Sequence, residues 1–337
     1  MKRLWLMLAL FCASSALADS RLRVATFNVG LGRDGPGLLL KDILDQDEDI
    51  LAIAKIIETV APDIILLTGF DNDYTTLALT RFNALEGLGY EFIFAPLGNA
   101  GLDSGLDLND NGQLGDWNDA WGFGRFEGSE GMALLSRYPI VGSRRFDQLK
   151  WHDFGAPPRA PDGTNFFDHW LELRLASHSL WDVEILAPFG PLHIVAAHPT
   201  PPVFDGEEDA NGMRNAAETH VLNRYLAGEA FTDDAGTTAA LPDRPVILLA
   251  DLNADPTRGD SQKQALQSLL NHPRLQATNT LDTANWETTG PLRVDYALPD
   301  ARLTLLGSGV FWPESNALIE AAQTRHRLVW VDVGLPE

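Results

Sequence analysis

The chain has 337 residues, a formal charge of −22 and a single cysteine. Its composition, 45% hydrophobic and 21% charged, is that of a globular protein and excludes a disordered tail. The excess of 47 acidic over 25 basic residues argues against a broad basic surface for bare DNA, and one cysteine excludes a disulfide framework within the chain.

The first 18 residues have the pattern of a secretory signal peptide. Lys2 and Arg3 precede an apolar run over residues 4–11, and Ala16-Leu17-Ala18 is a small-x-small cleavage site. We therefore expect an exported chain, periplasmic or secreted, that is cut after residue 18; the alternative is a buried first helix. No apolar run reaches the roughly 20 residues that span a bilayer, so we expect no transmembrane segment. We also expect a monomer.

The mature chain, residues 19–337, alternates short apolar strands with helices. Helical periodicity predicts helices over residues 49–60, 75–88, 214–226 and 262–270. Short β-type runs, several of them continuously apolar as in strands buried on both faces, predict strands over residues 22–28, 64–67, 91–95, 132–136, 170–176, 181–186, 192–197, 246–250, 293–298 and 328–333. Residues 98–131, rich in Gly, Asp and Asn, form one long loop insertion. Without repeats or linkers, this order predicts one domain of two packed sheets with flanking helices.

Four of the predicted strands end in, or carry, a polar side chain. The first ends in Asn28, another runs into His198, and the run after residue 293 carries Asp295. The strand over residues 246–250 runs into Asp251 and Asn253, and residues i and i+2 of an extended segment share a face. Such a pair can hold a water against a phosphorus or a metal. One Asp-x-Asn alone is more often a turn, but four clusters in one chain indicate a site.

Several motifs, in order, resemble the endonuclease/exonuclease/phosphatase superfamily, which has the deoxyribonuclease-I-like fold. They are Thr26-Phe27-Asn28-Val29, Pro62-Asp63 with its apolar run, Gly-x-Ala-x-x-Ser-Arg-x-Pro-Ile over residues 131–140, the His198 strand, Asp251-Leu252-Asn253-Ala254, Val294-Asp295-Tyr296 and Arg325-His326. The resemblance extends over residues 22–333. It implies a four-layered α/β sandwich that acts as a divalent-metal-dependent phosphoesterase.

The resemblance assigns roles to the motif residues. Asn28 would lie beside a catalytic Mg²⁺ or Mn²⁺ and the scissile phosphate, Asp251 would orient or deprotonate the attacking water, and Asn253 would bind the phosphate. Fixed donors and a divalent metal stabilise the charge that in-line attack builds on phosphoryl oxygens.

Two histidines complete the implied catalytic set. His198 and His326 would steady the phosphoryl oxygens or protonate the leaving group, and Asp295 would orient His326. The substrate stays open among nucleic acid, a phospholipid headgroup and a small organic phosphate. The acidic charge argues weakly against a processive DNA enzyme.

The strand after Pro62-Asp63 departs from the superfamily. Its members usually have Gln-Glu where this chain has Thr68 and Gly69, and that Glu binds the metal. Asp71, two residues further, could take its place on the same face, with Asp73 as support or second ligand. The alternative is a damaged metal site in a non-catalytic protein that binds a phosphate ligand or a partner.

Two arginines and one further histidine have open assignments. Arg325 stands where the family often has Asp; it could grip a substrate phosphate, because Arg binds phosphate oxygens in pairs, or be an ordinary surface residue. Arg214 could face the substrate or pair with nearby acids. His178, between two predicted strands, could lie near the cleft or away from it.

The long loop contains the first half of an EF-hand-type calcium motif. Oxygen-bearing side chains stand at its positions 1, 3 and 5, Gly112 stands at position 6, and a backbone carbonyl would follow. No Glu stands at position 12, so Asp116 or Asp119 would supply the missing carboxylate. The motif predicts a structural Ca²⁺ that orders the loop, and the alternative is a solvated turn-rich loop; the candidate ligands are Asp107, Asn109, Asn111, Gln113 and Asp116.

Overall fold

The central strand of the first sheet, β1 (Leu22–Leu31), is almost wholly buried because apolar residues alternate between two cores. Phe27 packs toward helices, whereas Val24 packs toward the second sheet. In this computed structural model, which describes residues 21–335, β1 pairs parallel with β2 and antiparallel with β15. Across the sheet the order is β14 (Thr304–Phe311), β15 (Leu328–Gly334), β1, β2 (Ile64–Phe70), β4 (Gly131–Ser136) and β3 (Phe92–Phe94).

The second sheet has five strands and a parallel pair of its own. Its order is β13 (Asp295–Pro299), β10 (Val246–Asp251), β7 (Gly190–Ala197), β6 (Leu180–Ala187) and β5 (Ile140–Arg145). Strands β10 and β7 are parallel, so their carboxyl ends lie at the same end of the sheet. Two small hairpins, β8 (Phe231–Thr232) with β9 (Thr238–Ala239) and β11 (Ala284–Trp286) with β12 (Gly290–Leu292), decorate the fold.

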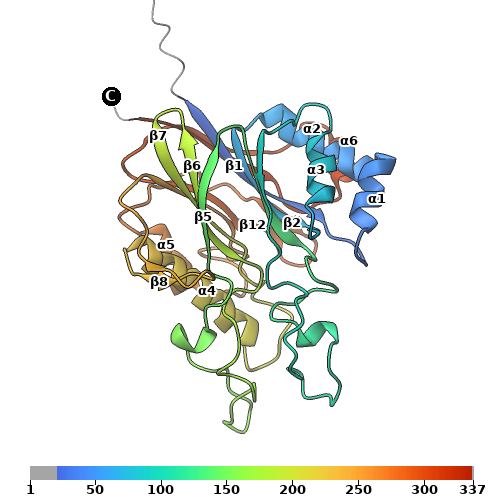
Figure 1. The fold of residues 1–337 in the computed structure, drawn as a ribbon, viewed down its shortest axis with the longest axis vertical. Coiled ribbons are helices and arrows are strands. Elements are labelled where there is room, and N and C mark those ends of the chain that lie inside the picture. Colours follow the sequence, from blue (N-terminus) through green and yellow to red (C-terminus); the bar gives the residue numbers. More distant parts are fainter. Residues whose placement is uncertain (1–20, 336–337) are drawn as a thin grey trace, which may run out of the picture.

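The two sheets pack face to face, and helices cover both outer faces (Figure 1). Helices α1 (Leu38–Asp45), α2 (Glu48–Val60), α3 (Leu77–Asn83) and α6 (Asn316–Ala322) contribute to the core on the first sheet, and α4 (Ala210–Leu226) and α5 (Lys263–Leu270) to the core on the second. This confirms the predicted four-layered α/β sandwich. None of the helices within residues 21–335 is both long and apolar enough to cross a membrane.

The long loops and the polar strand ends lie at one end of the sandwich. The insertion over residues 98–131 leads into β4, whose first residue, Gly131, pairs with Phe70 at the carboxyl end of β2. The segment before β6 arrives beside the end of β7, because Leu180 pairs with Ala197. Both loops extend from this end in Figure 1. The candidate residues therefore gather between the two sheets, at the end from which these loops extend.

Some predicted elements differ from the structure. Residues 170–176 form turns and not a strand, because Leu173 and Leu175 are buried against α4 from a loop. The helix predicted over 75–88 is only α3, and the proposed signal peptide, residues 1–18, lies outside the described residues. Strands β5 and β14 and helices α1 and α6 were not predicted, although α1 buries Leu39 and Ile43 at helical spacing.

Candidate active site

The site begins with one hydrogen bond between the two sheets. Asn28 lies on β1 of the first sheet and Asp251 ends β10 of the second, 223 residues further along the chain. The Nδ2 group of Asn28 donates to Oδ2 of Asp251 over 2.8 Å. Asp251 is fully buried, and burial, reinforced by the charge of Asp295, raises the pKa of its carboxyl to about 6. The residue is therefore ionised at neutral pH but remains basic enough to accept a proton.

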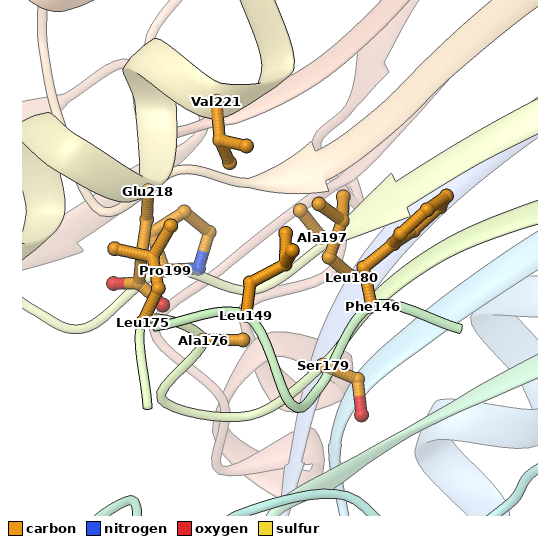
Figure 2. Close-up of a pocket in the computed structure, with 10 residues that line it drawn as sticks. All are labelled: Phe146, Leu149, Leu175, Ala176, Ser179, Leu180, Ala197, Pro199, Glu218 and Val221. Atoms are coloured by element: carbon orange, nitrogen blue, oxygen red, sulfur yellow. The ribbon is translucent and has the colours of Figure 1, made fainter. Parts of the chain in front are cut away.

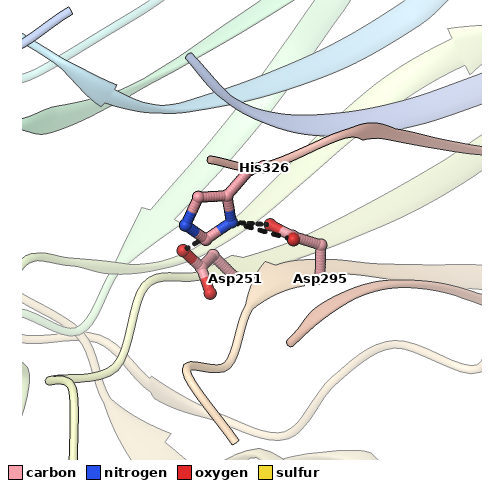
Figure 3. Close-up of side chains that lie close together, drawn as sticks. All are labelled: Asp251, Asp295 and His326. Atoms are coloured by element: carbon pink, nitrogen blue, oxygen red, sulfur yellow. Dashed lines mark hydrogen bonds and ion pairs between the residues drawn. The ribbon is translucent and has the colours of Figure 1, made fainter. Parts of the chain in front are cut away.

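His326 and Asp295 form the second pair of the site. Nδ1 of His326 lies 2.9 Å from Oδ2 of Asp295 and 3.8 Å from Oδ2 of Asp251 (Figure 3). Burial alone would lower the pKa of His326, but the charges of Asp295 and Asp251 outweigh it and raise this pKa to about 9. At neutral pH the imidazole is a cation, and its Nε2 is a second N–H donor.

His198 reaches the same carboxylate from β7. Its Nε2 lies 3.5 Å from Oδ2 of Asp251. Its ring is stacked on that of His178, with the centroids 3.9 Å apart and the planes at 19°. Burial, together with the neighbouring charges of His178 and His326, lowers the pKa of His198 well below its ordinary value. The site thus contains one cationic and one neutral imidazole, and the structure places His178 against His198.

Asn253 lies near Asp251 for a reason that differs from the prediction. The strand ends at Asp251, and Asn253 has a left-handed backbone with φ 52°, so the shared face of an extended segment does not apply. The backbone N–H of Asn253 donates to Oδ1 of Asp251, and its Nδ2 donates to the carbonyl of Pro199. Asn253 therefore fixes the turn that follows β10. The hydrogen bond from its Nδ2 to Pro199 also fixes the orientation of its side-chain amide.

Gly69 leaves no room for a side chain. Its φ is +67°, and an added Cβ would lie 2.5 Å from Oδ1 of Asn28 and 3.2 Å from the backbone nitrogen of Gly30. Oδ1 of Asn28 accepts a hydrogen bond from that same N–H of Gly30. The Asn28 amide therefore occupies the space that a residue with a side chain would need at this position.

Asp71 and Asp73, the predicted metal carboxylates, have other partners. Both oxygens of Asp71 accept backbone N–H groups, from Arg33 and Glu130, each over 2.8 Å, and burial raises the pKa of Asp71 to about 6. Asp73 accepts the N–H groups of Leu77 and Ala78 and so caps the start of α3. The hydrogen bonds at the start of α3 thus explain the carboxylate of Asp73 without a metal. Asp71, in contrast, directly follows β2, at the end of the sheet where a metal ligand was expected.

Glu130 is an acidic residue that sequence reasoning missed. It directly precedes β4 and lies beside Asp71, and its carboxylate occupies the space next to Gly32. Burial raises the pKa of Glu130, although Arg125 opposes this. The signal in the sequence was its place before the Gly131 motif, whose strand pairs with β2.

Within residues 21–335, one group of three or more acidic or histidine side chains is close enough to hold a metal. It consists of Asp251, Asp295 and His326, whose ligating atoms lie within 4.8 Å of one another. The carboxylate oxygens of Asp251 and Asp295 suit Mg²⁺, Mn²⁺ or a similar divalent cation, whereas the protonated imidazole of His326 has no free nitrogen lone pair to ligate one. Two adjacent buried carboxylates also favour an added positive charge. The two carboxylates therefore fit a divalent cation, with the amide of Asn28 alongside.

The two arginines differ in what they can bind. Arg325 is exposed next to His326 and forms no ion pair with the residues that the structure describes. Arg214, in contrast, donates to the backbone carbonyls of Leu175, Trp121 and Arg174. Its guanidinium is committed to the loops, so Arg214 is a structural residue and is not placed to hold a substrate phosphate.

The loop with the calcium motif is closed by its own hydrogen bonds. Asp107 accepts the N–H of Gly112, and the amides of Asn109 and Asn111 donate to Asp116. The N–H of Gln113 donates to Oδ1 of Asn111. The predicted ligands therefore lie together, and Ca²⁺ binding at this loop stays a prediction.

One comparison with known proteins identifies the family of this chain. Residues 25–317 match the Endonuclease/Exonuclease/phosphatase family. None of the curated proteins matches the chain. Among solved structures, an endonuclease/exonuclease/phosphatase from Beutenbergia cavernae is 19% identical with a TM-score of 0.57, and the alignment covers 94% of this chain and 72% of that one.

Two further solved structures carry more specific names. Sphingomyelinase C from Streptomyces griseocarneus is 16% identical, with a TM-score of 0.51 and coverage of 93% and 99%. The human Nocturnin catalytic domain with bound sulfate is 14% identical, with a TM-score of 0.51 and coverage of 95% of each chain. At these identities the likeness establishes the fold alone, whereas the family match extends over most of the sequence. The chain therefore belongs to the endonuclease/exonuclease/phosphatase family.

Proposed function

We propose that this protein is an exported, divalent-metal-dependent phosphoesterase, which hydrolyses a phosphodiester or phosphomonoester by in-line attack of water. The observation that carries the proposal is the buried array of Asn28, Asp251, Asp295 and His326 between the sheets. Membership of a family that acts on phosphoesters supports it. Asp251 has the pKa of a base that works near neutral pH.

The residues divide the reaction between them. Asp251 accepts a proton from the attacking water through an oxygen that Asn28 already orients. His326, held by Asp295, donates Nε2–H to a phosphoryl oxygen or the leaving group. His198, kept neutral by burial, supplies a further donor. A divalent cation bound beside Asp251 and Asn28 would neutralise charge on the phosphoryl oxygens.

The competing function is non-catalytic binding of a phosphate ligand or a partner. It is motivated by Gly69, which offers no metal carboxylate, and by Asp71, whose oxygens already accept two N–H groups. Such a protein would bind phosphate esters at Arg325 and His326 without turning them over.

One assay separates the two functions. The mature protein, residues 19–337, is incubated with a bis-aryl phosphodiester and Mg²⁺, Mn²⁺ or Ca²⁺, and then with DNA, RNA, a sphingomyelin-type lipid and a sugar phosphate. We expect turnover that EDTA abolishes and that Asp251→Asn reduces by roughly 1,000-fold or more. Absence of turnover with every metal and substrate would leave only the binding function. Mass spectrometry of the exported chain checks cleavage after residue 18.

A further inference from the structure

Helix α4 turns three polar side chains toward the loops beside the active site. Arg214 donates to loop carbonyls, and Asn215 donates through Nδ2 to the carbonyls of Thr200 and Leu252, each over 2.8 Å. Glu218, one turn further, accepts hydrogen bonds from the same region. Since Leu252 stands between Asp251 and Asn253, this helix face contacts the backbone of the catalytic strand ends directly.

The carboxylate of Glu218 joins two of these loops. Its Oε1 accepts the N–H and the Oγ–H of Ser177, over 2.7 and 2.9 Å, and its Oε2 accepts the N–H of Thr200 over 2.8 Å. All three partners are donors, which an ionised carboxylate satisfies best. Burial nevertheless raises the pKa of Glu218 to about 7, against the nearby charge of Arg214 and these bonds.

Glu218 has little access to bulk solvent, because its side chain is buried. Glu218 borders a cavity of about 10 Å³, which is lined mostly by apolar side chains such as Phe146, Leu149 and Val221 (Figure 2). That volume holds about one water molecule. Within the protein, the side-chain hydrogen bonds of Glu218 are therefore the ones made to Ser177 and Thr200.

Ser177 and Thr200 are neighbours of the stacked histidines. His178 follows Ser177, and His198 lies two residues before Thr200. Nδ1 of His178 donates to the backbone carbonyl of His198 over 2.9 Å, which fixes its tautomer because a carbonyl can only accept. The ring of His178 covers that of His198, whose Nε2 faces Asp251. The contacts therefore run without a gap from Glu218 to the catalytic carboxylate.

We propose that Glu218 is a positioning residue, whose carboxylate holds the two loops so that the stacked pair His178–His198 keeps His198 directed at Asp251. The proposal rests on the proposed phosphoesterase function. Without this carboxylate the loops are free to shift, and a displacement of about 1 Å near the reacting atoms costs on the order of 100-fold in rate.

The test replaces the carboxylate by the amide of equal size. Glu218→Gln presents one acceptor and one donor to three donors, so at least one hydrogen bond is lost. We expect kcat to fall about 10- to 100-fold while KM stays within about threefold, since no substrate contact changes. Ser177→Ala removes the Oγ bond to Glu218 together with the Oγ contacts, each at 3.3 Å, to Nδ1 of His178 and the carbonyl of His198, and should cost about fivefold. The matched control is Glu229→Gln, because Glu229 is an exposed residue that pairs with Arg224; we expect wild-type kinetics.

Histidine NMR provides a second readout that does not need activity. Long-range ¹H–¹⁵N spectra should show His178 as the Nδ1–H tautomer in the wild type and as a mixture in Glu218→Gln. A wild-type kcat or an unchanged His178 tautomer in the folded variant overturns the proposal. If Glu218→Gln does not fold, Glu218→Asp, which keeps the charge on a shorter side chain, decides by the same two measurements. If the wild type hydrolyses no phosphoester, the proposed function fails, and the tautomer alone then decides whether Glu218 locks the pair.

Discussion

At the scale of single residues, the site depends on charged groups that set each other's protonation states. Asp295 is the partner that keeps His326 protonated, and burial keeps the carboxyl of Asp251 from being too weak a base. Asn28 holds Oδ2 of Asp251, the same oxygen that lies near His198 and His326. Asp251 thus acts as the base, while Asp295 keeps His326 protonated.

These charges predict a bell-shaped pH profile of kcat/KM. Asp251 must lose its proton, which occurs above a pKa of about 6, and His326 must keep its proton, which it does below about 9. Asp295→Asn removes a charge that raises the pKa of His326, so the alkaline limb should move down by roughly two pH units. The matched control is Asp243→Asn, which changes an exposed carboxylate far from the site. An unmoved alkaline limb would remove His326 from the acid role.

Sequence reasoning reached most of the catalytic residues but not their support. Asn28, Asp251 and His326 follow recognisable motifs, but Asn28 and Asp251 lie in different sheets and His326 precedes β15, so their meeting depends on how the two sheets pack. The stack of His178 on His198 and the bonds of Glu218 join separate loops, and no local pattern encodes such pairs. Arg214 and Asp73 have the right chemistry for a ligand, yet backbone groups occupy them.

At the scale of elements, the end of β2 is the most unusual feature. The strand carries a register shift between Thr68 and Phe70, and Gly69 has a left-handed backbone there. This irregularity turns the glycine toward Asn28. The sequence alone indicated a missing ligand, whereas the structure explains why no side chain fits.

Gly69→Ala should therefore damage both stability and activity. The new Cβ would strain the backbone and displace the Asn28 amide, so we expect a loss of about 1–3 kcal/mol and a fall in kcat of roughly tenfold or more. Gly89→Ala is the matched control, because Gly89 has a similar φ of +64° with no atom within 4 Å of the added Cβ. That variant should lose only about 1 kcal/mol and no activity. Equal behaviour of the two in thermal unfolding and kinetics would contradict the steric explanation.

The insertion loop gives a second prediction at this scale. If Ca²⁺ binds at Asp107 and its neighbours, millimolar Ca²⁺ should raise Tm by several degrees, since the ligand binds only the native state. Asp107→Asn should abolish most of this shift. Asp110→Asn removes the same charge from an exposed loop position outside the predicted ligand set and should keep the shift. A full Ca²⁺ shift in Asp107→Asn, measured by differential scanning fluorimetry, would rule out this site.

At the scale of the whole molecule, the apolar layer between the sheets holds the site in place. Leu249, Ile247 and Ala196 lie fully buried in this layer, on the strands that end at Asp251 and His198. The strands could be predicted because both faces of each are covered, which produces continuous apolar runs. The edge strands β5 and β14 are half covered and gave no such signal.

Leu249→Ala tests how much this layer contributes to the free energy of unfolding. The change removes buried methyl groups and leaves a cavity, so the free energy of unfolding should fall by about 2–5 kcal/mol. Leu186→Ala makes the same change at a strand residue that is 48% exposed and should cost less than about 0.5 kcal/mol. Urea unfolding measures both. Similar losses would mean that the inter-sheet layer is not the principal core.

The pairing of β1 with β15 has a consequence for how the molecule is assembled. Leu22 pairs with Val333, so the backbone of one side of β1 has its hydrogen-bond partners more than three hundred positions away in the chain. During synthesis the first sheet stays open along β1 until β15 (Leu328–Gly334) leaves the ribosome, and such distant pairing makes folding slow. A chain that stops before β15 would expose the backbone edge of β1 and should aggregate.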